Sequence, residues 1–136
     1  MNETQIDTSV LDRNAFVGRL GGDPELVAEV VQLFLMRYES AMNDIRSAVR
    51  CVNLKLLERA AHLLRGYFVS FQAQRASEAA HALEIKGRLG DAQNIILLLE
   101  NLEREVRLLI PAIKDVAEGG GPLTVSPRPT TSSAID

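Results

Sequence analysis

Apolar residues recur every three or four positions along most of the chain, and no segment alternates convincingly with a period of two. This pattern predicts an all-α protein. We expect a short first helix over residues 10–20, closed by Gly21-Gly22. A second, long helix should follow, capped by Asp23, with Pro24 at its first position and its end near Arg50. Its predicted apolar stripe comprises Leu26, Val30, Leu33, Phe34, Ala41, Ile45 and Ala48, with Val27 and Met42 at the edges.

Three more helices are expected in the second half. Asn53 should cap a third helix that runs to about Gln72, where a weak break precedes a fourth helix over residues 75–89. Gly90 should close the fourth helix and Asp91 should cap the fifth. The fifth is the most apolar, and Pro111 inside it should kink or shorten it. Its inward residues are expected to be Ile95, Leu98, Leu99, Leu102, Val106, Leu109 and Ile113.

Short connections between these helices favour antiparallel neighbours. We therefore predict an up-down-up-down four-helix bundle, with the additional N-terminal helix as a lid at one end. The bundle should occupy residues 10–117, behind a polar segment over residues 1–9. Residues 118–136 are rich in Gly, Pro, Ser and Thr, and this composition is typical of a disordered tail.

Composition narrows the classes of partner. The 15 basic and 18 acidic residues are mixed along the chain and sum to −3, which gives no reason to expect nucleic acid or a membrane surface. The single Cys51 cannot form an internal disulfide, and no signal peptide is evident, so we expect a cytoplasmic protein. The longest aliphatic run, residues 95–99, is far too short to span a bilayer.

His62 lies at the centre of the polar face of the third helix. A helix advances about 100° per residue, so the residues within roughly 60° of His62 are Lys55, Glu58, Arg59, Arg65, Gly66 and Val69. The opposite side carries Leu57, Ala60, Leu64, Tyr67 and Phe71. An exposed imidazole with two arginines one turn away, and with a glycine that leaves space beside it, is well placed to carry a phosphoryl group.

The motif His62, Leu64, Arg65 and Gly66, with Ala73 eleven positions after the histidine, resembles a known signature. It is similar to that of the histidine-containing phosphotransfer (HPt) domains of two-component phosphorelays: His, any residue, Leu, Lys, Gly, then small residues and Gly-Ala. The resemblance covers about residues 10–115. Its further matches are residues 20–26, Phe34-Leu35, Asn53 and Leu83-Glu84; its departures are Arg65 for lysine, Tyr67 and Phe68 for small residues, and Gln72 for glycine.

The resemblance implies that His62 accepts a phosphoryl group from an aspartate of a receiver domain and passes it to another receiver. Arg65 is expected to stabilise the added charge, and Arg59 to assist it. Gly66 should permit close approach of the receiver, and the family alignment implies that Glu84 orients the imidazole. The implied partners are response-regulator receiver domains and a hybrid sensor histidine kinase. Magnesium is expected on the receiver, and no cofactor on this chain.

No ATP-binding signature occurs in the sequence, so we expect a phosphoryl carrier and not an enzyme that uses ATP, with a monomer as the default state. Two other functions stay open. The changes at Tyr67, Phe68 and Gln72 would also suit a non-transferring module that only binds receiver or kinase domains. Glu78 and His81 have the spacing of a di-metal ligand pair, although Glu58 and His62 do not supply a second one. The echo of the His62 segment around His81 is interpreted as coincidence.

Overall fold

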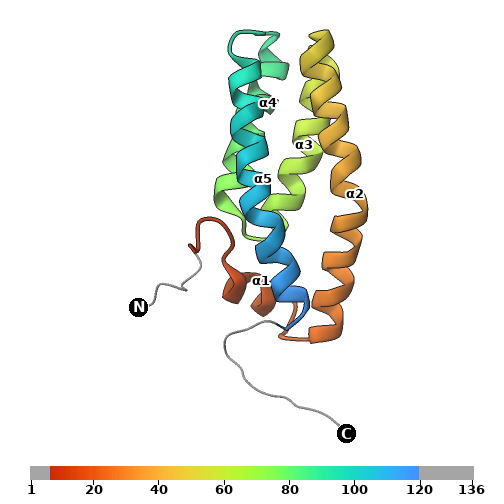
Figure 1. The fold of residues 1–136 in the computed structure, drawn as a ribbon, viewed down its shortest axis with the longest axis vertical. Coiled ribbons are helices and arrows are strands. Elements are labelled where there is room, and N and C mark those ends of the chain that lie inside the picture. The colour runs from red at the N-terminus through yellow and green to blue at the C-terminus, as the bar shows by residue number, and fades with distance from the viewer. Residues whose placement is uncertain (1–6, 120–136) are drawn as a thin grey trace, which may run out of the picture.

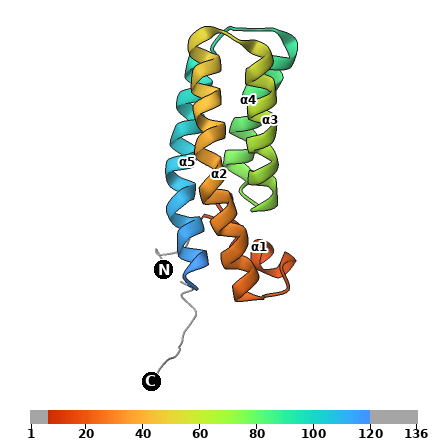
Figure 2. The same cartoon turned by 90° about the vertical axis from the view of Figure 1, so that its right-hand side faces the viewer.

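The protein is described by a computed structural model over residues 7–119, and these residues form helices and no strands, which confirms the all-α class. The elements are α1 (Arg13–Arg19), α2 (Pro24–Cys51), α3 (Leu54–Ser70), α4 (Gln74–Leu89) and α5 (Ile95–Ala117). Figures 1 and 2 show the four long helices side by side, with α1 across one end of them. The predictions for residues 1–6 and for the tail beyond Gly119 lie outside the described residues.

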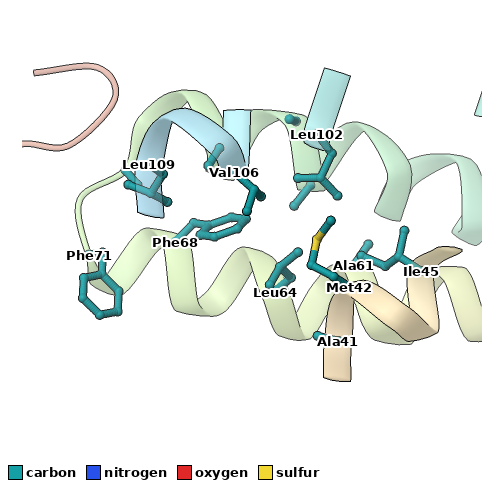
Figure 3. Close-up of a cluster of buried hydrophobic side chains, with 14 of the residues drawn as sticks. Ala41, Met42, Ile45, Ala61, Leu64, Phe68, Phe71, Leu102, Val106 and Leu109 are labelled. Atoms are coloured by element: carbon teal, nitrogen blue, oxygen red, sulfur yellow. The ribbon is translucent and has the colours of Figure 1, made fainter. Parts of the chain in front are cut away.

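The four long helices enclose one apolar core. α2 and α4 each pack against both α3 and α5, so the core lies in the middle of the four. In Figure 3, Phe68 of α3 points toward Val106 of α5, and Met42 of α2 lies near Leu64. Within residues 7–119, no helix is long and apolar enough to cross a membrane.

Helix starts follow the capping residues closely. Asp23 and Asn53 cap α2 and α3 as predicted: Asp23 accepts from the Glu25 and Leu26 N–H groups, and Asn53 accepts from the Leu56 N–H. The first helix begins later than predicted, because Asp12 accepts a hydrogen bond from the Ala15 N–H and caps α1. The expected start at Val10 is wrong, since this residue belongs to a turn in which its N–H bonds to the Asp7 carbonyl.

The connection between α4 and α5 differs from the prediction. Gly90 closes α4 in the left-handed region, as expected, with φ of 68°. Asp91 does not cap α5, because its carboxylate accepts from the Gln93 N–H and pairs with Lys86 at 2.9 Å. α5 starts only after Asn94 and then continues past Pro111 to Ala117, so the prediction that the proline shortens this helix is wrong.

The buried face of α2 is rotated relative to the predicted stripe. Leu26 and Leu33 are 38% and 49% exposed, whereas Val27 and Met42 are fully buried. The prediction centred the stripe on a single side, but α2 packs against two neighbours, α3 and α5, and its buried arc turns toward both. In α5, Leu98 and Leu99 are likewise only half-buried.

Candidate functional site

A glycine sets the distance between the two helices that carry the site. A Cβ added at Gly87 of α4 would lie 2.6 Å from the Glu58 nitrogen and 2.7 Å from the Leu54 oxygen of α3. Only a residue without a side chain allows the two backbones to approach this closely. Hydrophobic periodicity does not identify Gly87, but a glycine inside a helix is about 1 kcal/mol less favourable than alanine, and that cost is a signal in the sequence.

His62 projects from α3 with its side chain 65% exposed, as its helical phase predicted. Its Nδ1 lies 2.7 Å from Oε2 of Glu84 on α4. Glu84 is buried, with only 4% of its side chain exposed. The structure therefore brings together two residues that are 22 positions apart and leaves the rest of the imidazole open.

Glu84 also holds two arginines. The Arg65 Nε donates to Oε1 at 2.7 Å, and Arg88 Nη2 donates to Oε2 at 3.3 Å. Burial raises the pKa of Glu84, but the hydrogen bonds and charges of Arg65 and His62 outweigh it and lower the pKa from 4.5 to about 2. At neutral pH the carboxylate is ionised and can only accept hydrogen bonds.

The ionised carboxylate determines the tautomer of His62. Because Glu84 cannot donate, the proton of their hydrogen bond must be on Nδ1 of His62. The Arg65 Nη2 lies 3.4 Å from the same Nδ1, and two donors cannot bond to each other, so this is a contact between neighbours on one carboxylate. In the neutral imidazole, Nε2 then has the free lone pair.

Open space surrounds the histidine. Lys55, Glu58 and Arg59 line a hollow of about 640 Å³ together with His62 and Glu84. A Cβ added at Gly66 would meet nothing within 4 Å, so the fold itself does not require this glycine. Arg59 and Gly66 thus lie beside His62, as their helical phase predicted, and in the described structure the side chains that bond to Glu84 are those of His62, Arg65 and Arg88.

Arg88 was missed by the sequence analysis. It follows Glu84 by four residues, a spacing that places both side chains on one helix face, and its Nε also lies 3.7 Å from Glu58 Oε2. The four-residue spacing could have identified Arg88 from the sequence, but only once Glu84 was known to be buried. In the described part of the chain, no cluster of three or more His, Cys, Asp or Glu residues is arranged to hold a metal ion. His81 lies 3.5 Å from Glu84, and Glu78 accepts a hydrogen bond from Gln74.

Comparison with curated protein sequences gives no match at a significant level. The crystal structure of histidine-containing phosphotransfer protein B (HptB) from Pseudomonas aeruginosa PAO1 is similar in fold, with a TM-score of 0.74. The match covers 81% of this chain and 96% of that chain at 19% identity. The Hpt domain family model matches residues 29–115, more than half of the sequence. This chain therefore belongs to the Hpt domain family.

Proposed function

We propose that this protein is a phosphorelay carrier that accepts a phosphoryl group on Nε2 of His62 from a receiver aspartate and passes it to a second receiver. The observation that carries the proposal is the exposed imidazole whose Nδ1 is bonded to the buried, ionised Glu84. The scaffold is proposed to be an antiparallel up-down-up-down bundle over residues 10–117. A hybrid sensor kinase and receiver domains are the proposed partners.

The chemical step needs a nucleophile and an anchored ring. The Nε2 lone pair of neutral His62 attacks the phosphorus of the aspartyl phosphate and forms an N–P bond. The acyl P–O bond breaks, and the receiver carboxylate leaves with its electron pair. Phosphorylation leaves positive charge on the ring, and the Nδ1–H···Glu84 hydrogen bond stabilises that charge. The reverse sequence on a second receiver releases the neutral imidazole.

The positively charged side chains beside the imidazole favour binding of the negatively charged phosphoryl group. Arg65 is held at Glu84 by its Nε, which leaves its two Nη groups to face a phosphoryl group on the imidazole. Lys55 and Arg59 line the adjacent hollow on the same helix. Magnesium, when bound, would belong to the receiver and would neutralise the aspartyl phosphate before transfer.

The departures from the family signature affect packing more than the exposed face. Phe68 is fully buried in the core, and Tyr67 is half-buried with its ring 5.7 Å from that of Phe34. Gln72 follows α3 in the left-handed region, with φ of 60°, where glycine has no steric cost. Core packing explains Phe68 and Tyr67, whereas nothing in the structure explains glutamine at position 72. Because none of the three is hydrogen-bonded to His62, their placement supports transfer over a module that only binds.

Labelling separates the two functions. The whole chain is incubated with receiver domains from its own organism, each carrying a radiolabelled aspartyl phosphate. We expect wild type and His81→Gln to take up label, and His62→Gln to take up none. Label that persists in His62→Gln would contradict the site. Stable binding of phosphorylated receivers without any label on wild type would identify an interaction module instead.

A further inference from the structure

A second histidine faces the same carboxylate. His81 lies on α4, three residues before Glu84, and its Nδ1 is 3.5 Å from Oε1. This nitrogen is sealed from solvent and has no hydrogen-bond partner among the described residues, although 45% of the side chain is exposed. A buried polar atom without a partner is unusual in a folded protein and needs an explanation.

Electrostatics determines what the contact can be. Glu84 is ionised, so a lone pair on Nδ1 of His81 would face negative charge and be repelled. A proton on Nδ1 makes the contact attractive. A carboxylate oxygen has two lone pairs, so Oε1 can accept from His81 beside the Arg65 Nε. A small rotation of the imidazole would shorten 3.5 Å to hydrogen-bond length.

Glu84 is the carboxylate that His81 contacts, at 3.5 Å. His62 and Arg65 of α3 bond to the same carboxylate. On α4, Arg88 also bonds to Glu84, and Glu78 accepts from Gln74. Glu84 is therefore the carboxylate through which His81 can influence His62.

We propose that His81 is a positioning residue that tunes His62 through Glu84, an inference that rests on the proposed transfer at His62. With its proton on Nδ1, His81 donates to Oε1 and withdraws part of the carboxylate charge from the Nδ1–H of His62. The imidazole of His62 is then less electron-rich at Nε2, and phosphoryl acceptance is slower than it would be without His81.

Nuclear magnetic resonance of the imidazoles tests this coupling in the protein alone. The Nδ1-bound proton of His62 is compared in wild type, His81→Ala and His81→Gln at one pH. In His81→Ala the signal should lie further downfield than in wild type, because Glu84 then loses a competing donor. In His81→Gln the side-chain amide can donate to Oε1 instead, so the signal should stay near that of wild type. Glu78→Ala, one turn earlier on α4, is the matched control.

The kinetic counterpart is the rate of phosphoryl acceptance from a labelled receiver. His81→Ala should accept faster than wild type by about two- to tenfold, as expected for loss of one competing hydrogen bond, and His81→Gln should stay near wild type. His62 signals that move no more in His81→Ala than in Glu78→Ala would overturn the inference. If the signals move but no receiver labels His62, the coupling stands and the proposed relay function fails.

Discussion

At the scale of single residues, Glu84 links the stability of the fold to the chemistry of the site. Its side chain is nearly fully buried, yet it keeps a negative charge because His62, Arg65 and Arg88 donate to it. A buried charge with these partners is tolerated, whereas one without them is costly. The hydrogen bond that holds the imidazole, and that of Arg65, therefore also hold α3 to α4, whereas Arg88 lies on the same helix as Glu84.

This linkage predicts a pH-dependent stability. The pKa of Glu84 is about 2 in the fold and near its ordinary 4.5 in the unfolded chain. Because the folded pKa is lowered, the stabilisation is present above pH 4.5 and is lost as the pH falls toward 2. Glu84→Gln should reduce the free energy of unfolding by on the order of 2 kcal/mol at pH 7 and by much less at pH 2.5.

Urea unfolding at both pH values measures this difference. Glu78→Gln is the matched control, because Glu78 is exposed on the same helix and bonds only to Gln74 among its described side-chain contacts. An equal loss of stability at pH 7 and pH 2.5 in Glu84→Gln would contradict the argument, since packing alone would then account for it.

Gly66 gives a second prediction, in which stability and function move in opposite directions. A methyl group at this position meets nothing within 4 Å, and alanine is the better helix former. Gly66→Ala should therefore stabilise the protein by about 0.5–1 kcal/mol. The same methyl group lies beside His62 on the proposed receiver-facing surface, so phosphoryl acceptance should slow.

Thermal unfolding and receiver labelling together test this pair of effects. Gly18→Ala in α1 is the control, since its added methyl group also meets nothing within 4 Å but lies on a different helix from His62. It should change labelling little. Unchanged labelling by Gly66→Ala would show that the open space beside His62 is not used for docking.

The sequence predicts those features of the site that lie within a single helix, and it does not predict the contacts between two helices. The exposure of His62 and its neighbours Arg59, Arg65 and Gly66 follows from helical phase within α3. The contacts of Glu84 required the spacing of α3 against α4, which periodicity does not contain. Only the family resemblance suggested Glu84, and neither argument anticipated that His81 and Arg88 face the same carboxylate.

At the scale of elements, Gly87 controls the pairing of α3 and α4. An added Cβ would lie 2.6 Å from a backbone nitrogen of Glu58, and backbone cannot move aside as a flexible side chain can. Gly87→Ala should push α4 outward, with a net loss of about 1–3 kcal/mol. Glu84, one turn earlier, should then lose contact with His62.

Two measurements check this prediction. Chemical denaturation should show destabilisation of Gly87→Ala, and the Nδ1-bound proton of His62 should move upfield as the hydrogen bond to Glu84 lengthens. Gly66→Ala is the control. Both glycines lie inside helices, but of the two only Gly87 would bring an added Cβ against the backbone of another helix. Stabilisation by both substitutions would refute the role of Gly87.

The start of a helix could be predicted from the sequence where a capping side chain of the same segment determines it. Asp23 and Asn53 bond to the backbone of their own helices, so capping chemistry was sufficient. Asp91 has an equally good capping side chain, but Lys86 competes for it and α5 starts after Asn94. The buried face of α2 likewise depends on two neighbouring helices, α3 and α5, at once. Leu26 and Leu33 are exposed although they are hydrophobic, so hydrophobicity alone does not identify this face.

At the scale of the whole molecule, Arg75 joins three parts of the chain at the end near α1. Its guanidinium bonds to both oxygens of Glu105 on α5, at 3.0 Å each, and to Asp7 at 3.3 Å. Its backbone N–H donates to the Ser9 carbonyl. Glu105 is largely buried, so Arg75 neutralises a carboxylate that has little access to water.

Arg75→Ala should therefore lower the free energy of unfolding measurably, because it leaves Glu105 buried without its partner. Arg75 is itself partly exposed, which limits the effect. Asp7→Asn should cost far less, since the exposed Asp7 pair is screened by water. Urea unfolding midpoints of the two variants give the comparison.

The double variant Arg75→Ala with Glu105→Leu distinguishes two causes of the lost stability: the missing attraction of the ion pair, and the cost of a buried Glu105 carboxylate without a partner. If the cost comes from the unpaired carboxylate, removing it should recover most of the stability lost in Arg75→Ala. Phosphoryl labelling at saturating receiver should stay near wild type in every variant, because the contacts of Glu84 involve neither residue. A loss in Asp7→Asn as large as that in Arg75→Ala would place the stabilisation in the N-terminal segment instead of the bundle.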